Sequence, residues 1–362
     1  MADLVKRAAR QAIAAAARAT RLWPPVPRGC GLVLRYHRIG ECGLGVPAAE
    51  FDAQLGFLAA RARVLTAGQM AAAVAAGEPL PPNAVAITFD DGYEDNASRA
   101  LPLLQRHGLR ATFFVTTGWI GTEKVLWWDR LHDYVRQALA AGARPLDFEG
   151  LPPPMAEALA AANLLAPADA ARLEHALLAA LRGISLTPEE TDTLVERVAA
   201  ALGADVADPE PCRPMSWDQV RALRDAGMEV GSHTVSHARL ASVPPERAFE
   251  ELEQSKQALE RELGASPSLV ACPGGECNQD AVDLIQEAGY SAAFTTESGP
   301  VRPGDDVFRL RRVGVWAGGY RGVFSAFSAS VFGLQLGRLA RHPAGTHPAG
   351  SQPAGGCGSG NA

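Results

Sequence analysis

The chain has 362 residues, of which 47% are hydrophobic and 20% charged, and its formal net charge is −6. This composition is typical of a globular protein with a substantial core, and the net negative charge argues against a general nucleic-acid-binding protein, which needs a basic surface. No run of about 18 uninterrupted apolar residues is present, so the sequence predicts no transmembrane helix.

The first 22 residues are basic and rich in alanine, and arginines interrupt every apolar run. A secretory signal needs an unbroken apolar segment after its basic start, so we expect no signal peptide and a location in the cytoplasm or at the cytoplasmic face of the membrane. The pattern favours an amphipathic surface helix, and peripheral membrane association through residues 1–22 is the alternative. Prolines follow, and we interpret residues 1–30 as this helix and a linker.

From residue 31 the chain alternates short apolar runs with helical patterns, which is typical of a parallel α/β domain. The predicted strands are 31–37, 85–89, 111–115, 228–232, 269–272, 291–295 and 308–315. The predicted helices are 47–61, 96–107, 216–226, 245–263 and 279–288.

The alternation stops between residues 119 and 212, where the sequence is rich in alanine and leucine. The segment Thr187-Pro188-Glu189-Glu190 predicts the start of a helix, with a capping threonine, proline at the first position and glutamate at the third. We interpret 119–212 as a helical insertion in a domain that spans 31–330. Residues 331–362 contain three Pro-Ala-Gly repeats and are predicted to be a disordered, low-complexity tail.

Three loops with chemically active residues each follow a predicted strand. They contain Asp90-Asp91-Gly92, the segment from His233 to His237, and Pro273-Gly274-Gly275. In a parallel α/β barrel the carboxyl ends of the strands form the active-site face. We therefore expect the three loops to meet at one rim.

Two histidines and an aspartate in these loops indicate a metal site. His233 and His237 are four residues apart, so one helical turn would place both imidazoles on one face. With eight histidines in the chain such a pair also arises by chance, and core or surface histidines are the alternative.

The adjacent carboxylates of Asp90 and Asp91 repel each other, and a bound cation would stabilise both. Asp-Asp-Gly is also a good turn sequence, which is the alternative interpretation. One aspartate and two histidines would leave an open position for water, as in catalytic zinc sites, and the other aspartate could take the proton of that water.

Both motifs resemble those of a known family. Thr88-Phe89-Asp90-Asp91-Gly92 and Ser232-His233-Thr234-Val235-Ser236-His237 resemble the first two motifs of the polysaccharide deacetylases, which are carbohydrate esterase family 4 with the NodB homology domain. The resemblance extends from about residue 32 to about residue 315, and 34–38 and 308–310 resemble the exopolysaccharide and poly-N-acetylglucosamine branch. It implies a distorted (β/α) barrel and hydrolysis of N-acetyl groups on an amino-sugar glycan or glycan precursor in polysaccharide synthesis.

The resemblance also implies roles for individual residues. Asp90 matches the general base, and Asp91, His233 and His237 match the metal triad. The expected cofactor is a divalent metal ion, Zn²⁺ first, with Co²⁺, Mn²⁺ and Ni²⁺ as alternatives. The expected partner is an N-acetylated glycan, which aromatic side chains could contact. The candidates are Trp127, Trp128 and Trp316.

The sequence departs from the family pattern at two places. In the third motif, Ala271 replaces an arginine that braces the base in many members, and Gly274 replaces an aromatic residue. The Gly274 N–H, next to Pro273, can still donate to an oxyanion. The late Leu-x-His motif that supplies the general acid is also absent. His37 matches a first-strand histidine that has this role in the poly-N-acetylglucosamine branch, and a core histidine is the alternative.

Two other functions stay open at this point. A hydrolase of the same fold could act on another C–N bond, such as that of a small cyclic amide. A glycan-binding module without activity would explain the missing arginine and histidine. The presence of Asp90 argues against the binding module, because binding has no need of a base beside the metal.

Overall fold

The computed structural model describes residues 26–40, 45–142, 150–161, 167–182, 184, 186–204, 212–316 and 328–340. The helix predicted within residues 1–22 and the tail beyond residue 340 lie outside these ranges. The chain divides into two compact units, a larger one from Met1–Thr122 and Pro214–Thr346 and a smaller one that includes Glu123–Arg213. No helix within the described ranges has the length and hydropathy that a membrane span requires.

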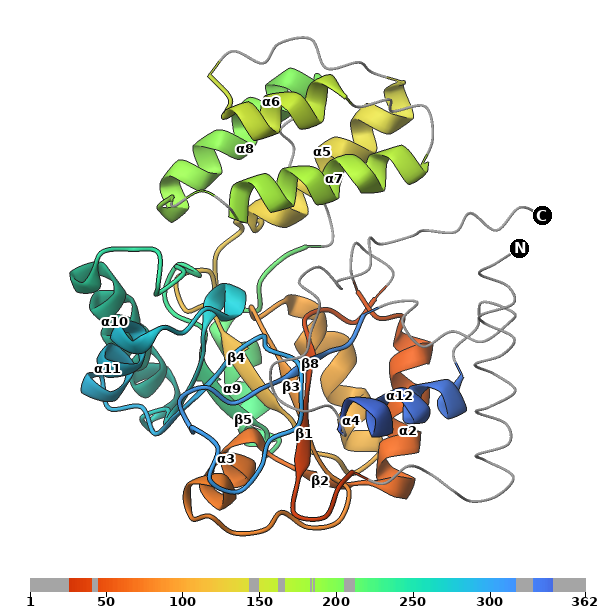
Figure 1. The fold of residues 1–362 in the computed structure, drawn as a ribbon, viewed down its shortest axis with the longest axis vertical. Helices are drawn as coiled ribbons and strands as arrows, with labels where there is room; N and C mark the ends of the chain where they lie inside the picture. Colours follow the sequence, from red (N-terminus) through yellow and green to blue (C-terminus); the bar gives the residue numbers. More distant parts are fainter. Residues whose placement is uncertain are drawn as a thin grey trace. The chain divides into compact units, whose positions relative to one another are not determined.

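The larger unit is built on an eight-stranded parallel sheet (Figure 1). Its strand order is β7-β6-β5-β4-β3-β1-β8, and β2 pairs with β3 outside this path. The strands are β1 Gly31–Tyr36, β2 Arg63–Leu65, β3 Ala84–Phe89, β4 Thr112–Val115, β5 Glu229–Ser232, β6 Leu269–Ala271, β7 Ala292–Phe294 and β8 Val313–Gly314. Six of the predicted strands are confirmed to within one or two residues, and β2 was not predicted.

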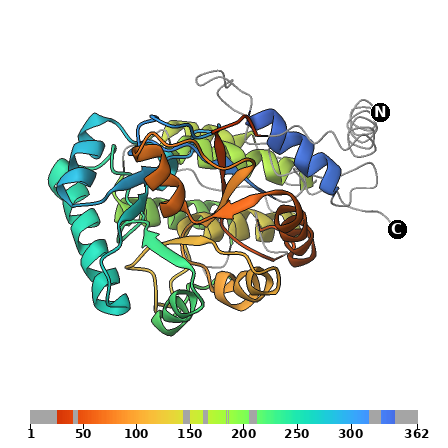
Figure 2. The ribbon, with the colours of Figure 1, turned by 90° about the horizontal axis from the view of Figure 1, so that it is seen from below.

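Helices cover the outside of the curled sheet, as the view along the strands shows (Figure 2). The helical elements of this unit are α2 Ala48–Arg61, α3 Ala67–Ala75, the π-helix η1 Asn96–Ala100, α4 Leu101–Arg106, α9 Trp217–Asp225, α10 Pro245–Leu263, the 3₁₀ turn η2 Pro273–Gly275, α11 Gln279–Glu287 and α12 Ala329–Leu339. All five predicted helices are present, and α3 and α12 were not predicted.

Side chains along the strands alternate between two cores. In β1, Leu34 and Tyr36 belong to the core that the sheet shares with α2, α4 and α9, whereas Val33 belongs to the core on the opposite face. Because successive strand residues point to opposite faces, Arg35 and His37 continue the inward series of Val33. The carboxyl end of β1 therefore directs polar side chains into the curl of the sheet.

The segment between β7 and the end of β8 connects the two edges of the sheet. Leu310 forms a parallel bridge with Phe294 of β7, and Val313 pairs with Leu34 of β1. The predicted strand 308–315 is therefore wrong in its extent, because this segment leaves one edge before it joins the other. The curled parallel sheet with outer helices is the distorted (β/α) barrel that the sequence predicts.

The smaller unit consists of helices, and its described residues contain no strand. The helices are α5 Trp127–Ala141, α6 Pro153–Ala160, α7 Pro167–Arg182 and α8 Pro188–Leu202. The predicted helix start is confirmed, because the Thr187 side chain accepts from the Glu190 N–H while the Glu190 carboxylate accepts from the Thr187 N–H. Leu131, Tyr134 and Val195 are among the buried residues that form its core.

The tail predicted to begin at residue 331 is wrong for residues 331–339, which belong to α12. Ser328 caps this helix, and Phe332 and Leu336, four residues apart, are both buried. The Phe332 ring packs edge to face against Phe57 of α2, with ring centroids 5.7 Å apart. The Pro-Ala-Gly repeats begin only at residue 343, so the apolar spacing before them was misread as part of the tail.

Candidate metal centre and active site

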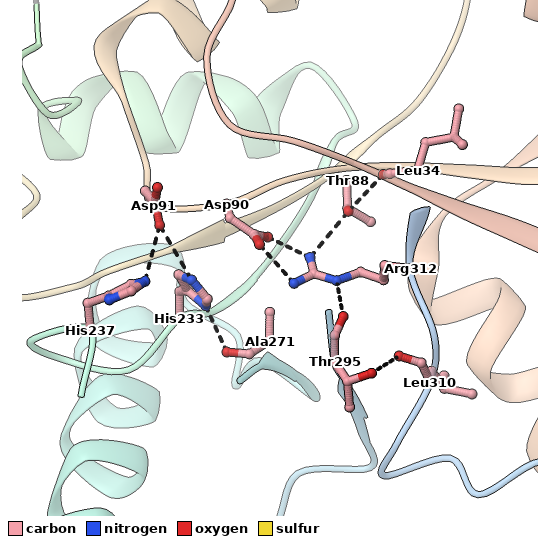
Figure 3. Close-up of polar contacts among 10 residues, drawn as sticks. All are labelled: Leu34, Thr88, Asp90, Asp91, His233, His237, Ala271, Thr295, Leu310 and Arg312. Carbon is pink, nitrogen blue, oxygen red and sulfur yellow. Dashed lines mark hydrogen bonds and ion pairs between the residues drawn. The ribbon is translucent and has the colours of Figure 1, made fainter. Parts of the chain in front are cut away.

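Three predicted metal ligands lie together at the carboxyl ends of two strands. Asp91 is the second residue after β3, and His233 and His237 follow β5, two strands along in the sheet. Their ligand atoms all lie within 4.8 Å of one another. Figure 3 shows both imidazoles turned toward the Asp91 carboxylate. The chain therefore brings together the Asp-His-His set that the sequence predicts.

The spacing of these atoms fits a shared metal ion better than direct hydrogen bonds. Asp91 Oδ1 lies 3.4 Å from His233 Nε2 and 3.6 Å from His237 Nε2. Two ligand atoms that each lie about 2.1 Å from a tetrahedral ion are about 3.4 Å apart. Asp91 Oδ1 is also buried and has no hydrogen-bond partner among the described residues. A buried oxygen of this kind is costly unless a cation or donor compensates it.

Each histidine is held in a form that can bind a metal. His233 Nδ1 lies 2.7 Å from the Ala271 carbonyl oxygen, so it donates a proton there and leaves the lone pair of Nε2 toward Asp91. Burial and the neighbouring His233 lower the pKa of His237 to about 3, so its imidazole is neutral at pH 7. Neutral imidazole is the form that coordinates metals.

The loop that carries the histidines is not a helical turn, so this part of the sequence interpretation is wrong. Thr234 and His237 have φ angles of 64° and 60°, and Asp91 has 76°. Only four described residues other than glycine have positive φ, and three of them lie in these two loops. Left-handed backbone is unusual for threonine, because its branched side chain crowds the carbonyl. Asp91 and His237 therefore lie on strained backbone, which is often found at functional sites.

Asp90 does not belong to the triad and is held by a buried arginine instead. Arg312, between the Leu310 bridge and β8, donates from its two terminal nitrogens to Asp90 Oδ1 at 2.6 Å and Oδ2 at 2.8 Å. Its Nε donates to the Thr295 carbonyl oxygen at 2.9 Å. Figure 3 shows the guanidinium between Asp90 and Thr295. Arg312 has no exposed surface, so this pair is fully desolvated.

The charges around the two aspartates keep both ionised. Burial alone would raise the pKa of Asp90, but the charge and hydrogen bonds of Arg312 outweigh it and hold the pKa well below its usual range. Burial likewise would raise the pKa of Asp91, and the imidazoles of His233, His37 and His237 lower it below its ordinary value. Asp90 is thereby compensated by a guanidinium, whereas Asp91 faces imidazoles, which compensate its charge only when they carry a proton.

His37 lies close enough to both aspartates for their charges to act on it. Burial lowers the pKa of His37, and the carboxylates of Asp91 and Asp90 offset only part of this. Its carbonyl oxygen accepts from Asn96 in η1 at 2.8 Å, which fixes the backbone just after β1. The structure places His37 at the predicted rim, and its role as an acid stays a prediction.

The loop of Pro273 and Gly274 lies beside the loop that carries the two histidines. Pro273 and Gly274 follow β6, and Gly274 adopts a left-handed conformation with φ of 69°. The Gly274 carbonyl oxygen accepts from the Thr296 hydroxyl at 3.1 Å. A side chain at Gly274 would meet that of Arg239, which comes two residues after His237. The oxyanion role of Gly274 and Pro273 stays a prediction.

The three predicted aromatic contacts for sugar lie in different units. Trp127 and Trp128 begin α5 of the smaller unit, with ring centroids 5.2 Å apart. Trp316 follows β8 in the larger unit, and both its ring and the Arg35 guanidinium lie beside Gly314. Among the three, only Trp316 therefore shares a unit with Asp91, His233 and His237.

A sequence profile of the family described as polysaccharide deacetylase matches residues 77–146 and 192–293. The two matched segments contain Asp90, Asp91, His233, His237 and Gly274. The chain contains a polysaccharide deacetylase domain. It is therefore a hydrolase of the class that cleaves N-acetyl amide bonds, as predicted.

Similar proteins share this fold. YxkH of Bacillus subtilis (strain 168), which carries the name of a polysaccharide deacetylase, is 21% identical over 301 residues, 83% of this chain and 76% of YxkH. The structure of IcaB from Ammonifex degensii matches with a TM-score of 0.54 and 19% identity over 86% of this chain and 97% of IcaB. The Streptococcus pyogenes deacetylase PplD in complex with acetate matches with a TM-score of 0.52 and 17% identity, covering 82% and 96%. At these identities the two structures support the fold alone.

Arg312 is the site residue that the sequence interpretation missed. The third motif has Ala271 in place of the bracing arginine, and Arg312 contacts Asp90 instead from the segment just before β8. A signal was present, because Leu310, Arg312 and Gly314 occupy alternate positions of the predicted strand 308–315. An arginine on the inward face near the end of a barrel strand lies at the active-site rim.

Proposed function

We propose that this deacetylase uses a divalent metal ion to remove N-acetyl groups from an amino-sugar glycan or glycan precursor in polysaccharide synthesis. Asp91, His233 and His237 would hold the ion, and Zn²⁺ suits this donor set best. When bound, the ion would lower the pKa of a water molecule and polarise the acetyl carbonyl. The observation that carries the proposal is the Asp90–Arg312 pair directly beside the triad.

Asp90 would take the proton from the attacking water. Arg312 occupies one position on each Asp90 oxygen, and each oxygen keeps another lone pair for a proton donor. The bidentate contact also fixes the plane of the carboxylate, so the base needs no reorientation during the reaction. A buried ion pair is weak support for stability, because desolvation costs as much as the pair gains. The position of the Asp90–Arg312 pair beside the triad therefore favours a catalytic rather than a structural role for the pair.

Two other groups complete the proposed reaction. The Gly274 N–H would donate to the oxygen that becomes negatively charged as water attacks the acetyl carbon. His37 would donate a proton to the departing amine, which is otherwise too basic to leave. The products would be acetate and a free amino sugar. The Asp90–Arg312 pair argues against a glycan-binding module, since binding alone requires no fixed base.

The proposal is tested by measuring acetate release from a panel of N-acetylated glycans. Ring opening of a small cyclic amide is measured beside it, as the substrate of the alternative function. Release should stop with a chelator and return when Zn²⁺, Co²⁺, Mn²⁺ or Ni²⁺ is added. His233→Ala and His237→Ala should lose both the bound ion and the activity. His107→Ala is the matched control, because His107 pairs with Asp52 in the same unit at 2.7 Å and should bind no ion. Activity that survives in chelator and in both histidine variants would contradict the proposal.

A further inference from the structure

The loop between the two histidines rests on one buried carboxylate from α10. The N–H groups of Val235 and Ser236 both donate to Glu251 Oε2 at 2.8 Å. The Ser236 hydroxyl donates to Oε1 at 2.5 Å, and Arg247 donates to the same oxygen at 2.7 Å. Glu251 is only 1% exposed, so these four donors replace water around its carboxylate.

These contacts hold a conformation that the loop would not adopt by itself. Thr234 and His237, on either side of the two donating N–H groups, both have left-handed φ angles. Successive backbone N–H groups that converge in this way form a concave site for an anion. Glu251 fills this site, and removal of its carboxylate would leave the two N–H groups without their shared acceptor.

Other contacts hold the backbone of this loop from two sides. One turn further along α10, Ser255 contacts Ser232 through their hydroxyls at 2.6 Å, and Ser232 accepts from the Thr234 N–H at 3.0 Å. On the opposite edge, the Gly118 N–H donates to the Val235 carbonyl oxygen at 2.8 Å. Contacts from α10 and from the segment after β4 thus hold the backbone of the loop, while the imidazoles turn toward Asp91.

We propose that Glu251 is a positioning residue for the metal centre. Its carboxylate fixes the loop backbone so that His233 and His237 face Asp91 together. The inference rests on the proposed function only in requiring that the triad binds a metal. The Glu251 carboxylate thereby accounts for the strained backbone of the loop, which the Asp-His-His set alone does not explain.

Glu251→Gln tests this role, because the amide keeps the shape of the side chain but turns one acceptor oxygen into a donor. Glu250→Gln is the matched control, since Glu250 is the preceding residue of α10, is 55% exposed and contacts the same Arg247 at 3.9 Å. Affinity for Zn²⁺ and the visible spectrum of the Co²⁺-loaded protein are measured for both. We expect Glu251→Gln to bind roughly 10–100-fold more weakly, with an altered Co²⁺ spectrum, and Glu250→Gln to match the wild type.

The outcomes separate this inference from the proposed function. A wild-type protein that binds no metal would overturn both. Unchanged Zn²⁺ affinity and Co²⁺ spectrum in folded Glu251→Gln would overturn the positioning role alone. If Glu251→Gln does not fold, Ser236→Ala removes a single donor and Glu251→Asp keeps the charge on a shorter side chain. Both should weaken Zn²⁺ binding by a smaller factor, and wild-type affinity in both would overturn the inference.

Discussion

Replacement of Arg312 by methionine removes the guanidinium that pairs with Asp90 while filling a similar volume. Asp90 is 1% exposed and Arg312 is completely buried, so water cannot take the place of the guanidinium. The variant would leave an uncompensated carboxylate in the curl of the sheet, next to Asp91. Both stability and activity should suffer, for separable reasons.

The size of the stability loss follows from the two contacts at 2.6 and 2.8 Å. Hydrogen bonds to charged groups contribute about 1.5–3 kcal/mol each. Removing one partner of a buried ion pair costs about 3–5 kcal/mol, which agrees with two such bonds. Arg311→Met is the matched control. The neighbouring Arg311 is 22% exposed and has ion pairs of 3.5 Å with Glu297 and Asp305, so its loss should cost about 0–1 kcal/mol.

Urea unfolding of the metal-free protein at pH 7 and pH 4 measures this effect. In the wild type the pKa of Asp90 is lowered, so its contribution to stability is present above the unfolded pKa of about 3.9 and is lost as pH falls through the folded pKa. In Arg312→Met, burial without a counter-charge would raise the pKa of Asp90 above the unfolded value. The resulting penalty disappears as the carboxyl is protonated, so the deficit should be smaller at pH 4.

A second variant separates stability from catalysis. Arg312→Met combined with Asp90→Asn removes both charges, so it should recover much of the lost free energy of unfolding but no acetate release. The single Arg312→Met should lower kcat by at least roughly 10²-fold, because the base loses its fixed orientation. The reasoning is refuted if Arg312→Met unfolds like Arg311→Met and the double variant is no more stable than the single one.

Three further outcomes can be checked with single variants. Asp90→Asn should keep its Zn²⁺ affinity but lose most acetate release, because an amide cannot take the proton of water, and a loss of metal instead would show that Asp90 is a ligand. His37→Ala should lower kcat by roughly 10²–10⁴-fold on an N-acetyl substrate and much less on an activated ester, and equal losses would make His37 structural. Gly275→Ala should lower the melting temperature more than Gly264→Ala. Both have positive φ, at a backbone cost of about 1–2 kcal/mol, but only at Gly275 would the added carbon overlap the Thr296 side chain.

The three candidate metal ligands could be located from the sequence because of a general property of parallel sheets. Asp91 and His233 each come within two residues of the end of a predicted strand, and the ends of parallel strands meet at one rim. The register then brings them together, since β3 and β5 are both neighbours of β4. The strand pattern in the sequence and the strand neighbours in the sheet agree here. Residues more than a hundred positions apart in the sequence therefore form one site.

Other features could not be predicted because they depend on contacts rather than on patterns. Strand β2 has three residues, with Arg63 exposed and the other two half-buried, so it shows no apolar run and exists through pairing with β3. The loop after β5 was expected to be helical from the spacing of its histidines. Its real conformation depends on Glu251, a residue of a different element whose carboxylate replaces the hydrogen bonds of a helical turn.

Arg312 shows why a missing motif residue need not mean a missing function. The physical requirement is a cation against the buried Asp90 carboxylate, and any inward position near the rim can supply it. Arg312 reaches Asp90 across 222 residues of sequence because the chain crosses from β7 to β1 at that point, and β1 pairs with β3. The position of Ala271 is used differently, since its carbonyl oxygen orients His233. The end of β6 therefore orients His233 through its backbone, while Arg312 holds Asp90 from the segment that precedes β8.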